Sequence, residues 1–255
     1  MRTPDELHRL VETYLADLAL TPELGELAES MRYALEGGGK RIRPVICLAT
    51  GEAAGAEPEV VLPAAAALEL VHNFSLVHDD LPSLDNDELR RGRPSTWAQF
   101  GEAIAVLAGD ALLTEAFRLA LSYPTTAVAR ELAQATNGMI GGQYLDIQGT
   151  DDLAALHRLK TGCLFAASVG LALSAAGVPE SEQRPWRAFG DELGLLFQIV
   201  DDILDEDGYV LSHGRDGARV LADEAAERAH VRLEEVPADT AVLAEIVSGL
   251  AARTS

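Results

Sequence analysis

Apolar residues recur along most of the chain at the three- and four-residue spacing of α-helices, and no stretch shows the clear alternation of β-strands. Thr21-Pro22 is typical of a helix start, and the glycines at 37–39 are typical of a helix end. A long apolar helix is predicted to begin after Glu57 and to run into an acidic segment. Further helices are predicted over 103–122, 125–148, 152–176, 182–206, 215–235 and 239–252, with Asp151 and Asp239 as N-caps.

The composition of the chain also favours helices. Hydrophobic residues make up 48% of the sequence and aromatic residues only 5%, so alanine and leucine fill most apolar positions. Both lose little conformational freedom in a helix. The 255 residues contain no internal repeat, no low-complexity tract and no long linker. The sequence therefore predicts a single all-α domain over residues 1–255, built as a helical bundle.

Charge, hydropathy and cysteine content limit the surroundings in which we expect the protein. A net charge of −21 argues against nucleic acid or an anionic membrane as a general partner. No apolar run is expected to reach the roughly 20 residues of a membrane span, and MRTPDELHRL lacks the apolar segment of a signal peptide. Cys47 and Cys163 are too few for a disulfide framework and are predicted to be core thiols. These features favour a cytoplasmic protein without integral membrane association.

Two acidic clusters interrupt helices that are otherwise apolar. The first comprises Asp79, Asp80, Asp85, Asp87 and Glu88, and the second comprises Asp201, Asp202 and Asp205. Residues 201 and 205 of a helix lie one above the other, about 40° apart. In the first cluster Pro82 disfavours helix at the preceding residue, so a turn there can bring Asp85 back toward Asp79.

Paired carboxylates on largely buried helices point to a hard cation. Two carboxylates about 5 Å apart repel by roughly 3 kcal/mol at an effective dielectric constant near 20. They remain ionised together when a cation or strong hydrogen bonds offset this repulsion. Oxygen ligands without nearby cysteine favour Mg²⁺ over Zn²⁺. The alternative is that each cluster is an ordinary solvated face.

Basic residues accompany both acidic clusters. Only two of the 20 basic residues are lysines, Lys40 and Lys160. Lys40 follows a glycine run in GGGKRIRP (37–44), where backbone amides are accessible to an anion. Arg90, Arg91 and Arg93 follow the first acidic cluster. Unless these arginines only pair with neighbouring acids, the combination indicates a phosphorylated small molecule bridged by Mg²⁺.

Six segments together resemble the trans-isoprenyl diphosphate synthases, in particular the bacterial farnesyl type. They occur in the family's order as GGGKRIRP, HNFSLVHDDLPSLDNDELRRGRPS, AIAVLAGDALLTEAF, GGQYLDIQG, HRLKTG and FQIVDDILD. The resemblance implies an all-α bundle around a central cavity, with the acidic motifs facing each other across its mouth. It also implies condensation of isopentenyl diphosphate with an allylic diphosphate, dimethylallyl or geranyl, and a homodimer.

The resemblance assigns roles to individual residues. Three Mg²⁺ ions would be held by Asp79, Asp80, Asp85, Asp201, Asp202 and Asp205. Arg90 and Lys160 would contact the allylic diphosphate, while Thr161 and Gln198 would place oxygen dipoles near the allylic cation. The isopentenyl diphosphate would be held by Lys40, Arg43, His72 and Arg91.

The resemblance also bears on the length of the product. Phe74 and Ser75, which precede the first motif, would form part of the cavity floor. From the residues alone, His72, Phe74 and Ser75 would be ordinary core positions. A bulky residue at 74 resembles the farnesyl pattern, so a fifteen-carbon product is expected, with ten- and twenty-carbon products as alternatives.

One segment departs from the family, and other functions stay open. After DDILD the family has a longer loop that carries lysine, whereas this chain continues DEDGYVLSHGRDGARV without one. The nearby basic groups are His213, Arg215 and Arg219. Alternatives to chain elongation are a class I terpene cyclase, a helical phosphohydrolase suggested by VHDD (77–80), and a weakly active regulatory subunit of a heteromeric synthase.

Overall fold

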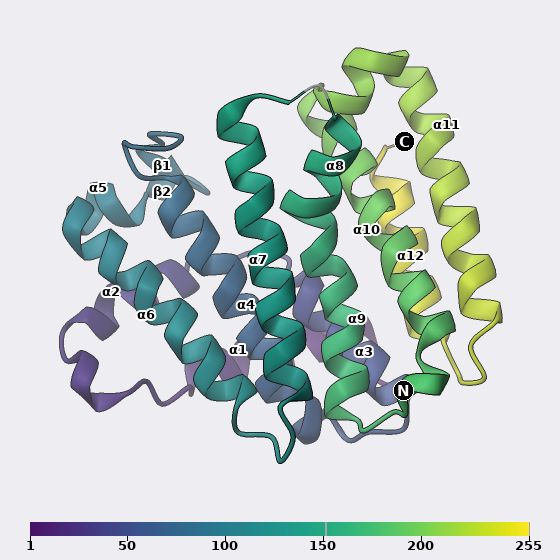
Figure 1. Cartoon of the computed structure of the whole chain (residues 1–255), viewed down its shortest axis with the longest axis horizontal. Coiled ribbons are helices and arrows are strands. Elements are labelled where there is room, and N and C mark those ends of the chain that lie inside the picture. Colours follow the sequence, from purple (N-terminus) through teal and green to yellow (C-terminus); the bar gives the residue numbers. More distant parts are fainter. Residues whose placement is uncertain (151, 255) are drawn as a thin grey trace.

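The structure is a computed structural model that describes residues 1–150 and 152–254, and helices dominate it (Figure 1). The N-terminal helices are α1 (Pro4–Ala16), α2 (Leu27–Leu35), α3 (Ile42–Ala53), α4 (Pro58–Asp79), α5 (Thr96–Phe100) and α6 (Glu102–Ala120). The remaining helices are α7 (Ala127–Gln148), α8 (Leu153–His157), α9 (Cys163–Ala175), α10 (Arg184–Asp205), α11 (Gly208–Glu234) and α12 (Ala241–Ala251). The all-α prediction is confirmed.

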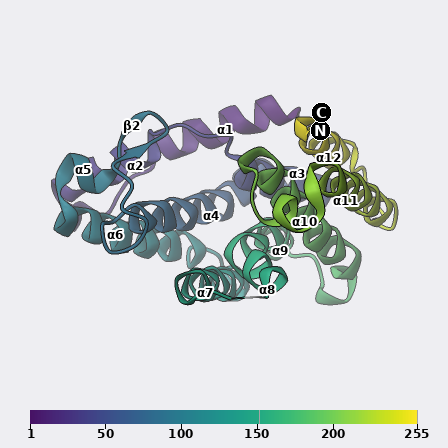
Figure 2. The same ribbon diagram turned by 90° about the horizontal axis from the view of Figure 1, so that it is seen from above.

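Helix α4 lies at the centre of the bundle. It contacts α1, α2, α3, α6, α7 and α9, and the view from above shows it enclosed by these neighbours (Figure 2). A run of small residues that point to all sides of the helix allows this close packing, because Ala64 to Ala67 are all buried. One cluster of buried apolar side chains extends from Leu7 to Leu250 and so draws on nearly the whole chain.

Helix α4 is also long and apolar enough to cross a membrane, by length and composition alone. The expectation that no apolar run reaches this length was therefore wrong. However, 72% of its most apolar window is buried inside the fold. Since a helix that is apolar all round can be buried in a protein core as well as in a membrane, this burial accounts for its composition.

Several predicted boundaries shift in the structure. Thr21 precedes only a 3₁₀ turn (Pro22–Leu24), and its hydroxyl donates to Glu115 instead of capping a helix. The predicted helix over 152–176 is divided into α8, a π-helical turn (Arg158–Gly162) and α9. Asp151 lies outside the described residues, and the neighbouring Asp152 caps α8 by accepting from the amide of Ala155. The N-cap of α12 is Thr240, one residue after the predicted Asp239.

Two short strands were not predicted. β1 (Leu89–Arg90) pairs with β2 (Arg93–Pro94) in an antiparallel hairpin, with Arg90 opposite Arg93. Two-residue strands are too short to show a period of two, so no sequence pattern could indicate them. The hairpin carries the basic residues that follow the first acidic cluster to the same end of the bundle as the C-terminal ends of α4 and α10 (Figure 1).

Candidate active site

The first acidic cluster is formed by the end of α4 and the turn that follows it. α4 ends at Asp79, three residues before Pro82, as predicted from the proline. The amide of Asp85 then donates to the carbonyl oxygen of Asp79 across 2.9 Å. The turn therefore returns Asp85 to Asp79, although a continuous helix would have separated them.

Burial makes these carboxylates hard to ionise. Desolvation raises the pKa of Asp79 to about 6, and the charge of Asp85 adds to this shift. The pKa of Asp201, near the end of α10, is likewise raised by desolvation and by Asp205, one helical turn further on. Such groups gain from a nearby cation, because it offsets both the desolvation and the mutual repulsion.

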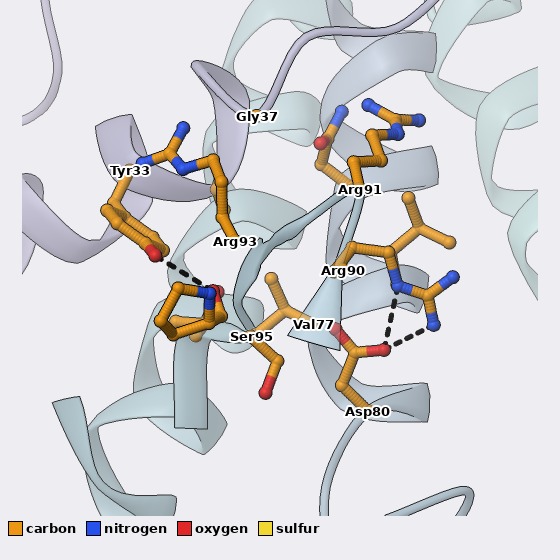
Figure 3. Close-up of a pocket in the computed structure, with 13 residues that line it drawn as sticks. Tyr33, Gly37, Val77, Asp80, Arg90, Arg91, Arg93 and Ser95 are labelled. Carbon is orange, nitrogen blue, oxygen red and sulfur yellow. Dashed lines mark hydrogen bonds and ion pairs between the residues drawn. The ribbon is translucent and has the colours of Figure 1, made fainter. Parts of the chain in front are cut away.

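Asp80 and Asp202 differ from these neighbours because both are buried and already have protein partners. Asp80 Oδ1 accepts from Arg90 Nε at 2.9 Å and also from Arg90 Nη2 (Figure 3). Asp202 Oδ1 accepts from Gln198 Nε2 at 2.6 Å, and its Oδ2 accepts from the amide of Tyr209 at 2.9 Å. Each acidic cluster thus contains a buried carboxylate that is hydrogen-bonded to the protein, next to carboxylates whose pKa values are raised by their acidic neighbours.

Within residues 1–150 and 152–254, no group of three or more His, Cys, Asp or Glu side chains is placed to hold a metal ion. This arrangement still fits Mg²⁺, which usually takes one or two carboxylates and completes its shell with water and substrate phosphate. The pairs Asp79–Asp85 and Asp201–Asp205 match that requirement in number and chemistry.

A basic cavity of about 500 Å³ gathers residues from five parts of the chain. Its lining includes all four residues expected to hold isopentenyl diphosphate, namely Lys40, Arg43, His72 and Arg91. Arg90 and Asp201 also line it. The structure therefore brings together side chains that lie up to 213 positions apart in the sequence, from Lys40 to Arg253.

Arg43 is held in this cavity without a carboxylate partner. Its guanidinium group stacks over the rings of Phe165 and Phe197, 4.5 and 5.6 Å from their centroids. Its buried Nε has no hydrogen-bond partner within the described part of the chain. A cation placed on aromatic faces with an unused donor is available for an anionic ligand.

His72 is electrically neutral in these surroundings. Desolvation, together with the positive charges of Arg43 and Arg91, lowers the pKa of His72 well below its ordinary value. A neutral imidazole offers one donor and one acceptor, so His72 can donate to a phosphate oxygen without adding charge.

A second cavity, of about 460 Å³, is mainly apolar and adjoins the first. Phe74, Ser75, Asp79, Lys160 and Thr161 all line it, and α7 supplies most of the opposite wall. The two cavities share Arg43, His72 and Leu76 in their linings. The basic cavity therefore lies directly against the apolar cavity, with Asp79 in the lining of the apolar cavity and Asp201 in the lining of the basic one.

Gln198 and Lys160 have surroundings that the sequence did not indicate. Gln198 lines a third cavity of about 630 Å³, beyond the π-helical turn, and so does not share a cavity with Thr161. The ammonium group of Lys160 donates to Asp146 across 2.5 Å. Arg215, the basic residue near the shortened loop, pairs with Glu206 instead of pointing to either acidic cluster.

Four residues near these cavities were not among the predicted site residues: Asp146, Gln143, Glu69 and Arg253. Gln143 and Asp146 belong to the matched segment GGQYLDIQG, which offered a signal for both. Arg253 lies far from every matched segment, and only the packing of the C-terminal end brings it to the basic cavity.

The cysteines are unpaired, as predicted. Cys47 is buried, whereas Cys163 is only half-buried and donates to the carbonyl oxygen of Leu159 at 2.7 Å. Desolvation raises the pKa of Cys163 to about 11, so this thiol stays protonated and weakly nucleophilic.

Comparison with known proteins links this geometry to one family. Residues 25–219 match the family described as polyprenyl synthetase. The chain is 44% identical over 199 residues to the farnesyl diphosphate synthase of Geobacillus stearothermophilus, covering 72% of this chain and 67% of that protein. It is 42% identical over 193 residues to the geranylgeranyl diphosphate synthase of Cyanophora paradoxa, covering 69% and 64% respectively.

A solved structure shows the same architecture over almost the full length. The geranyltransferase from Legionella pneumophila superimposes with a TM-score of 0.87 at 32% identity, and the match covers 98% of this chain and 96% of that one. By sequence, in contrast, the chain spans 64% of the length of the Cyanophora relative.

Proposed function

The chain belongs to the polyprenyl synthetase family, and from this membership we propose that it is a Mg²⁺-dependent short-chain prenyltransferase. It would condense isopentenyl diphosphate with dimethylallyl or geranyl diphosphate and release pyrophosphate, with farnesyl diphosphate as the product. The observation that carries this proposal is the contact between the basic and the apolar cavity, which share Arg43, His72 and Leu76. A head-to-tail condensation needs two diphosphates whose hydrocarbon ends meet.

The basic cavity is the proposed site of isopentenyl diphosphate. Lys40, Arg43 and Arg91 supply positive charge there, and neutral His72 supplies a donor. The unpaired Arg43 supports this assignment, because a diphosphate would provide the acceptors that the protein does not.

The acidic pairs are the proposed metal ligands. Asp79 with Asp85, and Asp201 with Asp205, would hold the Mg²⁺ ions, three in number by the resemblance. When bound, Mg²⁺ supplies fixed positive charge that stabilises the departing pyrophosphate. Asp80 and Asp202 belong to the same proposed set, because their present hydrogen bonds leave free lone pairs on the carboxylate oxygens with which each could bind a metal.

The allylic substrate is proposed to lie in the apolar cavity. Lys160 and Arg90 would contact its diphosphate, and both would exchange a carboxylate partner for phosphate oxygens. The carbon–oxygen bond breaks as pyrophosphate leaves, and the isopentenyl double bond forms the new carbon–carbon bond to the resulting allylic cation. A proton is then lost to the pyrophosphate. The hydroxyl of Thr161 lines the cavity in which the cation would form, and Gln198 would act from the far side of the π-helical turn.

Phe74 supports a fifteen-carbon product. It is only 8% exposed, lines the apolar cavity and packs edge-on against His78 with ring centroids 4.9 Å apart. Ser75 stands beside it and donates to the carbonyl oxygen of His72. A twenty-carbon product is the second candidate, because the Cyanophora relative is named for geranylgeranyl diphosphate. A ten-carbon product would require an apolar cavity that is shallower than the one that a fifteen-carbon product needs.

We further propose that residues 1–255 form one domain that acts as a cytoplasmic homodimer. The continuous hydrophobic cluster supports the single domain. Large apolar side chains on α6 support association, because Ile104, Val106 and Leu107 are exposed and line neither substrate cavity. Sedimentation velocity at micromolar concentration would separate a dimer from a monomer.

The alternative functions have less support. The intact second acidic cluster and the basic cavity favour chain elongation over a terpene cyclase. The presence of both acidic clusters also favours an active enzyme, because a regulatory subunit would be expected to lose them. The histidine–aspartate phosphohydrolase would need a metal-binding group of His and Asp, and no such group occurs among the described residues.

Product analysis by mass spectrometry tests the proposal. The purified chain would receive Mg²⁺, isopentenyl diphosphate and dimethylallyl diphosphate, and a matched sample would also receive EDTA. A farnesyl product that forms only without EDTA is expected. A folded protein that releases no pyrophosphate under these conditions would contradict the proposed activity, and a cyclic hydrocarbon product would establish the cyclase instead.

A further inference from the structure

The connection between α10 and α11 is built around the carboxylate of Asp202. α10 ends at Asp205 and α11 begins at Gly208, so only two residues join them. The backbone turns back sharply, because Glu206 and Gly208 both have positive φ angles, of 58° and 42°. The amide of Asp207 donates to the carbonyl oxygen of Asp202 at 3.0 Å, which fixes the turn to the preceding helix.

Asp202 also serves as the cap of the next helix. The residue before α11, Asp207, makes no side-chain capping hydrogen bond. Instead Asp202 Oδ2 accepts from the amide of Tyr209 at 2.9 Å, in the first turn of α11. A carboxylate in this position satisfies a backbone donor that has no partner within the helix.

The other oxygen of Asp202 fixes a side chain assigned to the reaction. Gln198 Nε2 donates to Asp202 Oδ1 at 2.6 Å, so the orientation of this amide depends on where the carboxylate lies. Asp202 is only 6% exposed, which leaves it little freedom to adopt another position. Buried His157 Nδ1, which has no hydrogen-bond partner among the residues that the structure describes, lies 3.9 Å from Oδ2.

Gly208 is in the closest contact with this carboxylate. A Cβ atom at position 208 would lie 2.1 Å from Asp202 Oδ2 and 2.7 Å from Asp202 Cγ. We propose that Gly208 is a positioning residue, whose missing side chain lets α11 close on Asp202 and so holds the Gln198 amide in place. Its effect on the reaction rests on the proposed function, whereas the contact itself does not.

The chain offers a matched control for this inference. Gly214 lies in the same helix and also has a positive φ, of 72°, but a Cβ there would meet no atom within 4 Å. Both variants place alanine at positive φ, and Gly214, with ψ of 161°, lies in a region that is essentially restricted to glycine, so Gly214→Ala sets an upper bound on the backbone cost. Only Gly208→Ala adds a collision with the carboxylate.

Hydrogen exchange of the Tyr209 amide, measured without substrate, is the first test. We expect about tenfold faster exchange in Gly208→Ala, because the amide loses its acceptor, and wild-type exchange in Gly214→Ala. In an Asp202→Ala background, Gly208→Ala should add no more to exchange or thermal destabilisation than Gly214→Ala does. Equal behaviour of the two glycine variants in the wild-type background would overturn the proposal.

Kinetics extend the test to the reaction. Gly208→Ala should lower kcat about tenfold and leave KM for isopentenyl diphosphate unchanged, because the basic cavity does not include Gln198. A rise in that KM with unchanged kcat would contradict the role given to Gln198.

If the wild-type chain forms no product, the proposed function fails, but the hydrogen-exchange comparison still tests the contact between Gly208 and Asp202. If Gly208→Ala does not fold, recovery of folding by added Asp202→Ala supports the proposal, and continued failure opposes it.

Discussion

Arg41 Nη1 donates to Glu69 Oε1 across 2.7 Å, and the two side chains are only 4% and 2% exposed. Arg41 has a left-handed backbone conformation, with φ of 43°, at the start of α3. Its Nε also donates to Glu12, so the guanidinium group links α1, α3 and α4. Arg41 and Glu69 both line the basic cavity together with Lys40 and Arg43, so this buried ion pair forms part of the cavity wall.

Arg41→Met should destabilise the fold by about 3–5 kcal/mol, since it leaves the charge of Glu69 buried without its partner. Urea unfolding followed by circular dichroism measures this change. Replacing both partners, in Arg41→Met/Glu69→Leu, should recover much of the loss. Arg232→Ala, which breaks an exposed pair with Glu235, is the control and should change stability by less than about 1 kcal/mol. Similar losses for Arg41→Met and Arg232→Ala would contradict the structural role of the buried pair.

Arg91→Ala should raise KM for isopentenyl diphosphate by roughly tenfold to a hundredfold, because it removes a charge-assisted contact to the diphosphate. Arg93→Ala is the matched control. Arg93 lies two residues away, but its guanidinium group stacks on the Tyr33 ring, 4.1 Å from the centroid, outside the basic cavity. The two variants are compared by initial rates at saturating allylic substrate. An equal change in KM would mean that general surface charge, and not the cavity, governs binding.

Phe74→Ala should lengthen the product, because the change opens the floor of the apolar cavity beside Ser75. Mass spectrometry of the prenyl alcohols should show that chains longer than fifteen carbons form most of the product. Phe117→Ala tests for general loosening of the fold, since Phe117 packs against the core but lines neither substrate cavity. A fifteen-carbon product from Phe74→Ala would place the chain-length barrier elsewhere.

Stability should depend on pH through His72. The pKa of folded His72 lies well below its ordinary value, whereas an unfolded histidine titrates near 6.5. The unfolded state therefore binds more protons as pH falls below about 6.5, so the folded state loses stability. Between pH 7.5 and 5.5 this histidine should account for about 1.4 kcal/mol.

That contribution is isolated by comparing His72→Asn with the wild type in urea unfolding at both pH values. His72→Asn should lose about 1.4 kcal/mol less than the wild type over this interval. The exposed His213→Asn should keep the wild-type dependence. Parallel losses in His72→Asn and the wild type would show that His72 does not stay neutral in the folded state.

Metal binding should appear as thermal stabilisation. Mg²⁺ with pyrophosphate at about 100 times its Kd should raise Tm of the wild type by roughly 5–10 °C. Asp79→Asn should reduce this shift strongly, whereas Asp110→Asn, at an exposed carboxylate of α6, should retain it. EDTA should abolish the shift in every variant. A full shift in Asp79→Asn would remove Asp79 from the proposed metal ligands.

Local features of this protein could be predicted from the sequence. The helical class follows from periodicity, and the end of α4 follows from the constraint that Pro82 places on its neighbours. Asp201 and Asp205 fall on one face of α10 because four residues make little more than one helical turn. The basic residues of the isopentenyl site were identified by resemblance, because each lies within a distinctive short segment.

Only the tertiary structure decided which of these residues meet. Asp80 and Asp202 look like their neighbours in sequence, yet packing buries them against Arg90 and Gln198. Nothing local to Gly208 indicates that its hydrogen atom faces a carboxylate six residues earlier. Helix type and turns depend on neighbours along the chain, whereas a partner, a cavity and a pKa depend on what the folded chain places across space.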